Sequence, residues 1–270
     1  MEQSTQGNLN IYRFSNLSAF EQVEHFITGR AGGYSKGPFQ SLNTGFHVGD
    51  NDWHVLQNRK KLAQVLKMDL QQFTFASQTH SSNIAIVDAS RKGLGSADRE
   101  SAIANTDGMV TNIKGVCINV QMADCVPVLL YDPKNKVVGA VHAGWRGTLK
   151  RVTQAAIKVM MDTYGCCPTN IMAGIGPSNG PCCYEVGEDV KREAMKSLPE
   201  AEQILSVAPE SGKYIFDQWQ ANLLQLLDCG IPEGNIEMAG ICSQCKSDNF
   251  FSSRNDNGLT GRYTAGIMLR

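Results

Sequence analysis

Three side chains of the kind that bind transition metals stand where predicted strands begin or end: His80, Cys125 and His142. Two imidazoles and one thiolate form a ligand set that zinc accepts, and three protein ligands leave a fourth position for water or substrate. Strand ends and the loops beside them are also where binding groups usually lie. The residue types and positions therefore predict a catalytic metal centre whose ligands, and catalytic residues, are His80, Cys125 and His142.

The relation between Cys125 and His142 follows from a predicted hairpin. Residues 126–131 and 137–142 are short apolar stretches, and the turn-forming residues 132–135 separate them. Cys125 precedes the first strand and His142 ends the second, so antiparallel pairing brings both to the same end of the hairpin. The third candidate ligand is not placed by this hairpin.

Each of the three residues also has a simpler interpretation. A single histidine is more often a core or surface residue than a ligand. A single cysteine is more often a buried, inert thiol. Cys125 paired with His142 also fits an activated nucleophile, which would make the protein a cysteine hydrolase. A metal that only stabilises the fold is the non-catalytic alternative.

A second chemical feature follows the His142 strand. Residues 144–148 contain two glycines and Arg146 and lead into a predicted helix. Backbone amides at a glycine-flanked helix start can hold an anion, and Arg146 would assist them. A tight turn with Thr148 as the helix N-cap explains the same residues equally well.

Nine cysteines are present, four of them in the adjacent pairs 166–167 and 182–183. In a reducing compartment such cysteines are buried thiols, metal ligands or nucleophiles rather than disulfides. Residues 242–245 form a CxxC, which is half of a zinc ribbon, but no second CxxC completes it. We therefore interpret this motif as structural.

The elements that must position these residues alternate irregularly along the chain. Strands are predicted over residues 25–28, 73–77, 83–88, 116–121, 126–131, 137–142, 170–174 and 235–239. Helices are predicted over residues 52–67, 148–164 and 188–197, and from an N-cap at Asp217 to a stop at Gly230. Strands and helices are thus interleaved along the chain but do not strictly alternate. This order favours a mixed-sheet α+β fold over a doubly wound parallel one.

Composition and charge exclude several classes of partner. The 25 Lys and Arg balance 26 Asp and Glu, whereas binding of nucleic acid needs a basic excess. No apolar run approaches the roughly 20 residues that span a bilayer. Residues 1–10, which we expect to be flexible, lack the apolar core of a signal peptide. We therefore expect a cytoplasmic protein without a nucleic-acid or membrane partner.

Motifs along nearly the whole chain occur in the order typical of one bacterial family. They occupy residues 32–39, 41–43, 47–50, 58–59, 78–80, 107–108, 123–127, 142–148, 174–177, 180–186, 242–245, 250–252 and 260–262. On these motifs the chain resembles the bacterial laccase-domain proteins, also called the polyphenol oxidase family, which includes YlmD-type and YfiH-type proteins. The resemblance implies a single domain over residues 1–270, with two mixed sheets face to face and helices outside them in αββα layers.

The resemblance also implies a chemistry. It implies that the three candidate ligands hold zinc, or copper in the same site. It implies phosphorolysis of adenosine, inosine and methylthioadenosine, together with hydrolytic deamination of adenosine. Arg59, Arg146 and Arg262 are then candidates for binding phosphate, and Asp124 and Asp107 for contacting the base or the ribose. The expected partners are purine nucleosides and phosphate, and we expect a monomer.

An older association of this family is copper-dependent oxidation of phenols. The chain has five histidines and no His-x-His pair, too few for the multicopper sites of a laccase. A single copper at the three ligands is still compatible with phenol oxidation, since Cu²⁺ binds nitrogen and sulfur sites more tightly than Zn²⁺ does. A copper-dependent polyphenol oxidase is therefore the main alternative function, beside the cysteine hydrolase.

Overall fold

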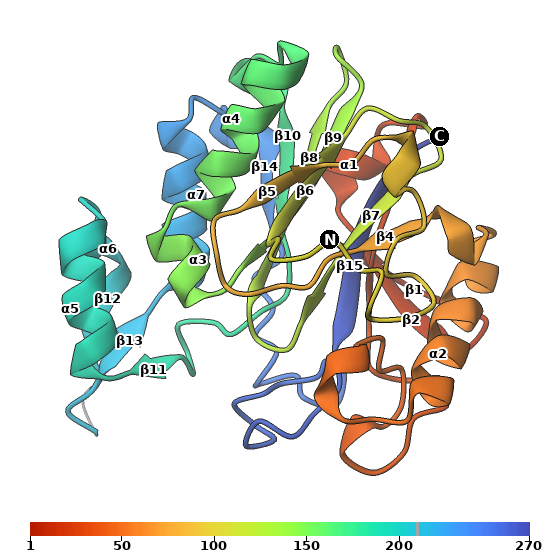
Figure 1. The fold of residues 1–270 in the computed structure, drawn as a ribbon. Helices are drawn as coiled ribbons and strands as arrows, with labels where there is room; N and C mark the ends of the chain where they lie inside the picture. Colours follow the sequence, from red (N-terminus) through yellow and green to blue (C-terminus); the bar gives the residue numbers. More distant parts are fainter. Residues whose placement is uncertain (209–210) are drawn as a thin grey trace.

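Two six-stranded sheets lie face to face in the computed structural model, which describes residues 1–208 and 211–270 (Figure 1). The first sheet has the spatial order β1 (Glu2–Gln6), β2 (Leu9–Arg13), β3 (Val23–Thr28), β15 (Tyr263–Leu269), β7 (Cys117–Met122) and β4 (Phe73–Phe75). The second has the order β14 (Ile236–Met238), β10 (Met172–Ile175), β8 (Val126–Asp132), β9 (Val137–Ala143), β6 (Gly108–Thr111) and β5 (Ile84–Ile86). Parallel pairs join β4 to β7, β5 to β6 and β10 to β14, and the other neighbours are antiparallel, so both sheets are mixed as predicted.

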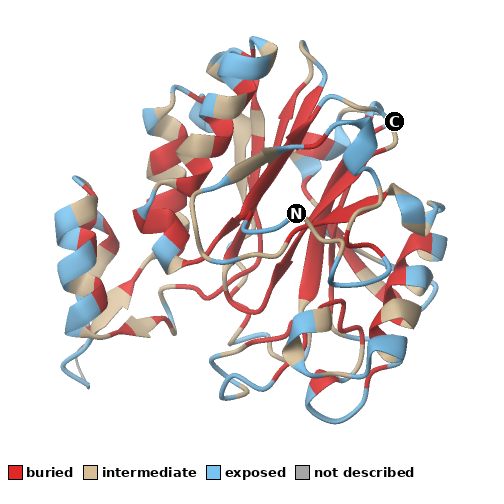
Figure 2. Ribbon diagram, in the orientation of Figure 1, coloured by how far each residue is buried: buried red, intermediate tan, exposed pale blue. Residues whose placement is uncertain are grey.

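The main core fills the space between the two sheets. Ile118 and Ala265 contribute to it from the first sheet, and Leu129 and Val138 from the second. Every residue of β7, β8, β9 and β15 is buried, as Figure 2 shows in red, because helices or loops cover the outer faces as well. Each buried Leu, Ile or Val side chain stabilises the fold by about 1.5–3 kcal/mol. The β8–β9 hairpin is therefore a firm support for the residues at its end.

Helices cover the outer face of each sheet and complete the αββα layers. Helix α2 (Asp52–Val65) packs on the first sheet through Leu62 against Phe26 and Phe73. Helices α3 (Trp145–Leu149), α4 (Val152–Tyr164) and α7 (Gln218–Asp228) lie on the other side, over the second sheet. Short helical segments complete the set: α1 (Ser15–Ser18), η1 (Gly37–Phe39), η2 (Phe46–Val48), η3 (Leu70–Gln72), η4 (Ala89–Arg91), η5 (Pro168–Asn170) and η6 (Glu233–Asn235). The α+β fold class is therefore confirmed.

A small unit projects beside α3 and α7, at the left of Figure 1. It consists of α5 (Glu188–Ser197), α6 (Ala201–Ile204) and an antiparallel three-stranded sheet in the order β11 (Glu185–Val186), β13 (Tyr214–Phe216), β12 (Leu205–Val207). Its apolar side chains, among them Phe216 and Ala194, form a separate cluster that includes Leu149 of α3. The sequence predicted α5 but not this sheet, because its strands have two or three residues and are mostly half-exposed.

The structure contains elements that the sequence patterns did not predict. The sequence predicts no strand over residues 1–10, but residues 2–6 form β1, which pairs antiparallel with β2. The sequence predicts one helix over residues 148–164, but Arg151 adopts a left-handed conformation (φ 58°) and separates α3 from α4. Strands β2, β6 and β15 were not predicted, although β15 lies at the centre of the first sheet. The other predicted strands and helices are confirmed, with shifts of a few residues at their ends.

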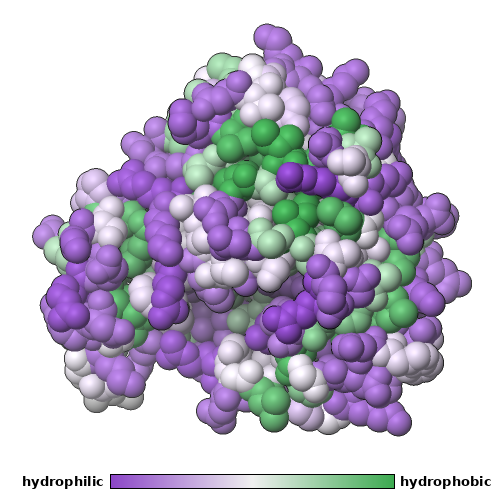
Figure 3. Space-filling model, viewed as in Figure 1, coloured by the Kyte–Doolittle hydropathy of each residue, from purple (hydrophilic) through white to green (hydrophobic). Residues whose placement is uncertain are grey.

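Among the described residues, no helix is both long and apolar enough to cross a bilayer. In the space-filling view of Figure 3, apolar surface is divided into patches between polar residues. Isolated apolar patches of this kind are ordinary on protein surfaces.

Candidate metal centre

The three predicted ligands come together in the structure. Cys125 directly precedes β8 and His142 is near the end of β9, and the register pairs Pro127 with His142, so both lie at the same end of the hairpin. His80 lies in the loop that connects β4 of the first sheet to β5 of the second sheet. The centre is therefore built from one end of the β8–β9 hairpin and the loop that crosses between the sheets.

The ligand atoms of His80, Cys125 and His142 all lie within 4.8 Å of one another. The Cys125 Sγ and His80 Nε2 atoms are 3.8 Å apart, and the two imidazole rings have centroids 5.0 Å apart at an interplanar angle of 73°. A tetrahedral zinc ion with ordinary bond lengths holds sulfur and nitrogen ligands about 3.6 Å from each other. The spacing and the donor types of this side-chain set therefore fit zinc.

The carboxylate of Asp107 organises the centre, although sequence reasoning considered it only for substrate contacts. Its Oδ1 accepts hydrogen bonds from His142 Nδ1 (2.9 Å) and from the His80 amide (3.0 Å). Its Oδ2 accepts from the amides of Thr79 (3.2 Å) and Ser81 (2.6 Å) and from the Ser81 hydroxyl (2.6 Å). A carboxylate on Nδ1 leaves the other ring nitrogen of His142 free to bind a metal, as in many zinc sites.

The local backbone is shaped so that the ligands can approach each other. His80 has a φ of 57°, a conformation that side chains rarely adopt, and the three consecutive amides bound to Asp107 hold it there. Gly144 follows the β9 strand, and a Cβ atom on it would lie 2.9 Å from Cys125 Sγ and 2.7 Å from the His80 ring. Only glycine fits at this position without moving two of the ligands.

The charges of these groups depend on each other. Burial raises the pKa of the Cys125 thiol, but the charge of His142 and hydrogen bonds from His142 and His80 outweigh it and bring the pKa to about 6. Burial lowers the pKa of His142, but Cys125 and Asp107 outweigh it and raise the pKa to about 9. Hydrogen bonds from His142 and Ser81 overcome the effect of burial on Asp107 and hold its pKa well below the usual range. Without metal, Cys125 and His142 thus form a thiolate–imidazolium pair.

Metal binding is therefore expected to strengthen as the pH rises from about 6 to about 9. In this range Cys125 is already a thiolate, but the metal must displace the proton of His142, so affinity rises about tenfold per pH unit. Below about pH 6 the thiol proton must also leave, and the dependence becomes steeper. Competition with a zinc chelator of known proton affinity, measured across this range, tests the expectation. A pH-independent affinity would contradict it.

Arg59 and Asp124, two candidates for substrate contacts, are held by the protein itself. The Arg59 side chain is 3% exposed and donates to the carbonyls of Thr44, Gly95 and Ser96. It also stacks between the rings of Phe46 (4.4 Å) and Phe75 (3.8 Å). Asp124 accepts from the Ser243 hydroxyl (2.7 Å) and the Arg254 amide (2.6 Å). Both residues clearly hold loops in place, and any contact with a substrate would be additional.

Arg262 and Arg146 are less occupied. Arg262 donates from Nη1 to the carbonyls of Thr260 and Gly261, both at 2.9 Å, and is close enough to Cys125 for their charges to interact. Arg146 is exposed in the first turn of α3, and its guanidinium lies 4.2 Å from the centre of the Trp145 ring. Among the described residues no carboxylate lies within ion-pair distance of Arg146.

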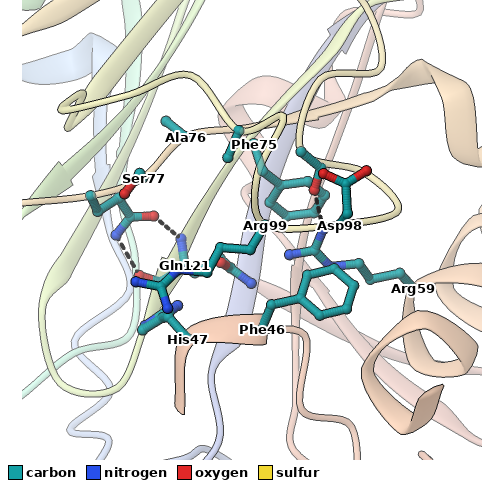
Figure 4. A pocket seen from close by; sticks show the side chains of 12 residues that line it. Phe46, His47, Arg59, Phe75, Ala76, Ser77, Asp98, Arg99 and Gln121 are labelled. Carbon is teal, nitrogen blue, oxygen red and sulfur yellow. Dashed lines mark hydrogen bonds between the residues drawn. The ribbon is translucent and has the colours of Figure 1, made fainter. Parts of the chain in front are cut away.

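A cavity of about 100 Å³ opens beside the His80 loop (Figure 4). Its wall includes Gln78, whose amide exchanges two hydrogen bonds of 2.8 Å with the backbone of Gln121. His47, Arg59 and Arg99 add basic groups to the same wall. Although His47 is an exposed residue, desolvation and then the charges of Arg262, Arg99 and Arg59 lower its pKa to about 4. The cavity therefore combines a neutral imidazole with several guanidinium groups, a combination suited to anions.

Sequence reasoning gave no role to His47 or Arg99. His47 lies in one of the motifs that carry the family resemblance, which was the available signal. Arg99 lies in a polar loop without a motif, so only the structure reveals its position. A second cavity of about 310 Å³ lies beside Asp124 and is lined by Asn179, Tyr184 and Arg254, among others. Tyr184 was likewise not predicted as a site residue.

Comparisons with known proteins agree with the fold. A family model described as "Multi-copper polyphenol oxidoreductase laccase" matches residues 24–270. The crystal structure of YlmD from Geobacillus stearothermophilus superposes with a TM-score of 0.93 at 36% identity, covering 100% of this chain and 98% of that one. This similarity confirms the single α+β domain with two mixed sheets.

Two curated proteins show how similar sequences are named. The chain is 37% identical over 256 residues to purine nucleoside phosphorylase YlmD of Bacillus subtilis (strain 168), covering 95% of this chain and 91% of that protein. It is 35% identical over 262 residues to adenosine deaminase RL5 from an unknown prokaryotic organism, covering 97% of this chain and all of that protein.

Proposed function

The chain belongs to the family described as multi-copper polyphenol oxidoreductase laccase, and from this we propose that it is a zinc-dependent purine nucleoside phosphorylase that also deaminates adenosine. The observation that carries the proposal is the convergence of His80, Cys125 and His142 around one point, with Asp107 behind them. We favour zinc over copper because neither reaction transfers an electron, although copper can occupy the same ligands. The expected partners are purine nucleosides and phosphate.

The two reactions differ in the nucleophile and in the bond that breaks. In phosphorolysis a phosphate oxygen bonds to the ribose C1′, the glycosidic bond breaks, and the base leaves with a proton. In deamination water adds to C6 of adenosine, and the C6 nitrogen leaves as ammonia. A zinc ion with three protein ligands supplies Lewis-acid activation of water at neutral pH. The chain's own residues must then bind phosphate, orient the nucleoside and donate the proton to the leaving group.

The positions of the basic residues support a phosphate site near this centre. Arg262 is close to Cys125, and together with Arg99 it is close enough to His47 to lower the pKa of that imidazole. Asp98 is the carboxylate in the same cavity wall, so positive charge is in excess there. Charge-assisted hydrogen bonds from guanidinium groups are strong and match the geometry of a phosphate. Neutral His47 is suited to accept or share a proton of the bound anion.

Incubation of zinc-loaded protein with adenosine, with and without phosphate, tests the proposal. Chromatography separates the products: adenine and ribose 1-phosphate report phosphorolysis, and inosine reports deamination. Base release is expected only when phosphate is present, and inosine in both cases. Base release that is independent of phosphate would indicate a nucleoside hydrolase instead. Absence of all three products from zinc-loaded protein would overturn the proposal.

Arg146→Lys is expected to reduce phosphorolysis about tenfold and to change deamination little. A guanidinium can hold phosphate with two parallel hydrogen bonds, whereas an ammonium acts as a point charge, and one charge-assisted bond contributes about 1.5 kcal/mol. Tyr184 places Arg146 near the centre. Burial chiefly raises the pKa of the Tyr184 phenol, and the charges of both Cys125 and Arg146 also affect it, so both residues lie near this phenol. The side chain is exposed, so the substitution should not disturb packing.

The measurement is kcat/KM for both reactions in the same preparation, with zinc content determined in parallel. Arg192→Lys, which alters another exposed arginine on α5, is the matched control and should change neither reaction. An equal loss of both reactions in Arg146→Lys would indicate a structural role for this residue.

A cysteine hydrolase is the second candidate, because one specific observation favours it. Cys125, His142 and Asp107 also form the series nucleophile, base and orienting carboxylate, with a thiolate that forms at neutral pH. The position of His80 argues against this function. Its imidazole lies 3.8 Å from the sulfur, where it would complete a metal site but has no role beside a cysteine nucleophile. Activity that survives chelation and is abolished by alkylation would favour the hydrolase.

A further inference from the structure

Four cysteines form a second cluster in the structure: Cys182, Cys183, Cys242 and Cys245, here called the four-cysteine cluster. Their sulfur atoms all lie within 4.8 Å of one another. The Sγ atom of Cys245 is 3.2 Å from that of Cys183 and 3.5 Å from that of Cys182. In a tetrahedral zinc site with Zn–S bonds of ordinary length, neighbouring sulfurs are about 3.8 Å apart. The two Sγ–Sγ distances from Cys245 are thus somewhat shorter than this spacing, and all four sulfurs are close enough together for one ion to contact them.

The backbone brings two distant segments together to build this cluster. An isolated bridge pairs Ser178 with Cys242, and the Ser243 amide donates to the Ser178 carbonyl at 3.0 Å. These contacts place the turn that contains Cys182 and Cys183 opposite the turn that contains Cys242 and Cys245. The CxxC therefore has its complementary pair, which lies about 60 residues earlier in the chain.

The turn at Cys182 and Cys183 explains how two adjacent side chains reach the same point. The amides of Cys183 and Tyr184 both donate to the Gly180 carbonyl at 3.0 Å, which is a helical type of turn. In an extended strand, neighbouring side chains point to opposite faces, whereas in a helical turn they diverge by only about 100°. The turn therefore permits both sulfurs to face Cys245.

The surroundings of Cys242 suit a metal thiolate. The Gly180 amide donates to Cys242 Sγ at 3.4 Å, a type of bond that stabilises negative charge on sulfur. Cys242 is buried, whereas Cys182 and Cys245 are exposed, so the cluster is accessible from solution. An ion can therefore enter without any opening of the fold.

We propose that the four-cysteine cluster binds a second zinc ion, which is structural and distinct from the ion at the candidate metal centre. Four thiolates and no open position are the usual composition of a structural zinc site. A disulfide accounts for the arrangement less well, since a bond between two sulfurs requires about 2.0 Å and would leave the other two cysteines unexplained. Binding releases the thiol protons and involves no oxidation.

The position of the cluster indicates what such an ion would do. Ser243 lies within the CxxC and bonds to Asp124, the residue before Cys125. Tyr184 directly follows Cys183 and lines the cavity beside Asp124. A zinc ion would therefore fasten both loops that border this cavity, and it would anchor the chain just before β11 of the projecting unit. Its loss should loosen these loops without removing a ligand of the first centre.

Metal analysis of the full-length protein, purified without chelators, tests this inference. The unaltered chain is expected to contain two zinc ions, one for each ligand group. Cys245→Ser and Cys125→Ala should each reduce the content to one, and the double variant should contain none. Cys167→Ser is the matched control, because Cys167 is also exposed but lies outside both groups. One ion in the unaltered chain that Cys245→Ser retains, or iron in place of zinc, would overturn the assignment.

A spectroscopic test avoids reliance on cluster variants that fail to fold. When cobalt replaces zinc in Cys125→Ala, the four-cysteine cluster should still give the intense sulfur-to-cobalt charge-transfer absorption of a tetrathiolate site. Absence of this absorption would overturn the proposal, as would a disulfide at Cys245 detected by mass spectrometry under non-reducing conditions. Both readouts count or identify metal, so they do not depend on whether the proposed nucleoside activity exists.

Discussion

Cys125→Ala is expected to abolish metal binding at the candidate centre and to reduce kcat/KM for both nucleoside reactions at least about 10³-fold, or about 4 kcal/mol of transition-state stabilisation. The thiolate is the only charged ligand of the three, so two neutral imidazoles would remain to hold a doubly charged ion. The ion would supply the Lewis acid of the proposed centre, so its loss should remove activity and not only weaken substrate binding. The reaction should thus be lost rather than slowed by a changed KM.

The fold should survive this substitution. Cys125 is only half-buried and lies at the edge of the main core, where its sulfur contacts the His80 imidazole. Circular dichroism and thermal unfolding of the metal-free forms should therefore differ little between the variant and the unaltered chain. Cys229→Ala, at another half-buried cysteine, is the matched control and should retain metal and turnover. Full activity with bound zinc at the centre of Cys125→Ala would show that the ligand assignment is wrong.

Asp107→Asn is expected to weaken zinc binding about 10–100-fold and to destabilise the metal-free protein by about 2–4 kcal/mol. The two oxygens of the carboxylate together accept six hydrogen bonds. The asparagine amide keeps one acceptor oxygen and has an NH₂ group in place of the other. This NH₂ group, itself a donor, must then face donors that the carboxylate had accepted. If the NH₂ faces His142, that ring must present an unprotonated Nδ1, which leaves the proton on the nitrogen that should bind metal.

If the NH₂ instead faces Ser81, two close donors lose their acceptor and the loop that carries His80 is no longer held. Either orientation should therefore disturb at least one ligand. Chelator competition measures the first effect, and denaturant unfolding of the metal-free protein measures the second. Asp88→Asn is the control, since Asp88 is exposed and caps a short helix elsewhere. Unchanged zinc affinity in Asp107→Asn would contradict the positioning role.

The same residue gives a pH dependence of stability. Its pKa in the folded protein is held below the usual value, so its contribution is complete above the unfolded pKa of about 4. The contribution is lost only as the pH falls further, through the lowered pKa that Asp107 has in the folded protein. The stability difference between the unaltered chain and Asp107→Asn should thus persist down to about pH 4 and shrink in stronger acid.

Arg59 illustrates a limit of inference from local pattern. Arg59 lies within a predicted helix, and the family resemblance makes it a candidate for binding phosphate. The structure buries it between two aromatic rings and bonds it to three backbone carbonyls. Helical periodicity distinguishes two faces but does not show what covers the polar one. The loops that cover Arg59 come from residues 44–46 and 95–96, which no helical pattern relates to it.

Strand β15 and the small three-stranded sheet show the same limit for the fold. Strand β15 lies between β3 and β7, although its residues are distant from both in sequence. Its buried side chains include alanine and glycine, so it carries a weaker apolar signal than β8 or β9. Gly266 is needed there because Phe26 and Asn119 of the neighbouring strands occupy the space of a Cβ. Such a requirement exists only after the sheet has formed.

What the sequence determined by itself was local: the hairpin that places Cys125 beside His142, several of the other strands, the longer helices, and the types of side chain able to bind a metal. Turn residues and apolar periodicity act between neighbours along the chain, so they can be recognised without a structure. The tertiary structure alone decided that His80 joins this pair from the loop between the two sheets, that Asp107 holds this loop beside the His142 ring, and that Cys182 and Cys183 lie beside the CxxC. These groups meet because two sheets pack against each other, and no local pattern specifies which distant loops then become neighbours.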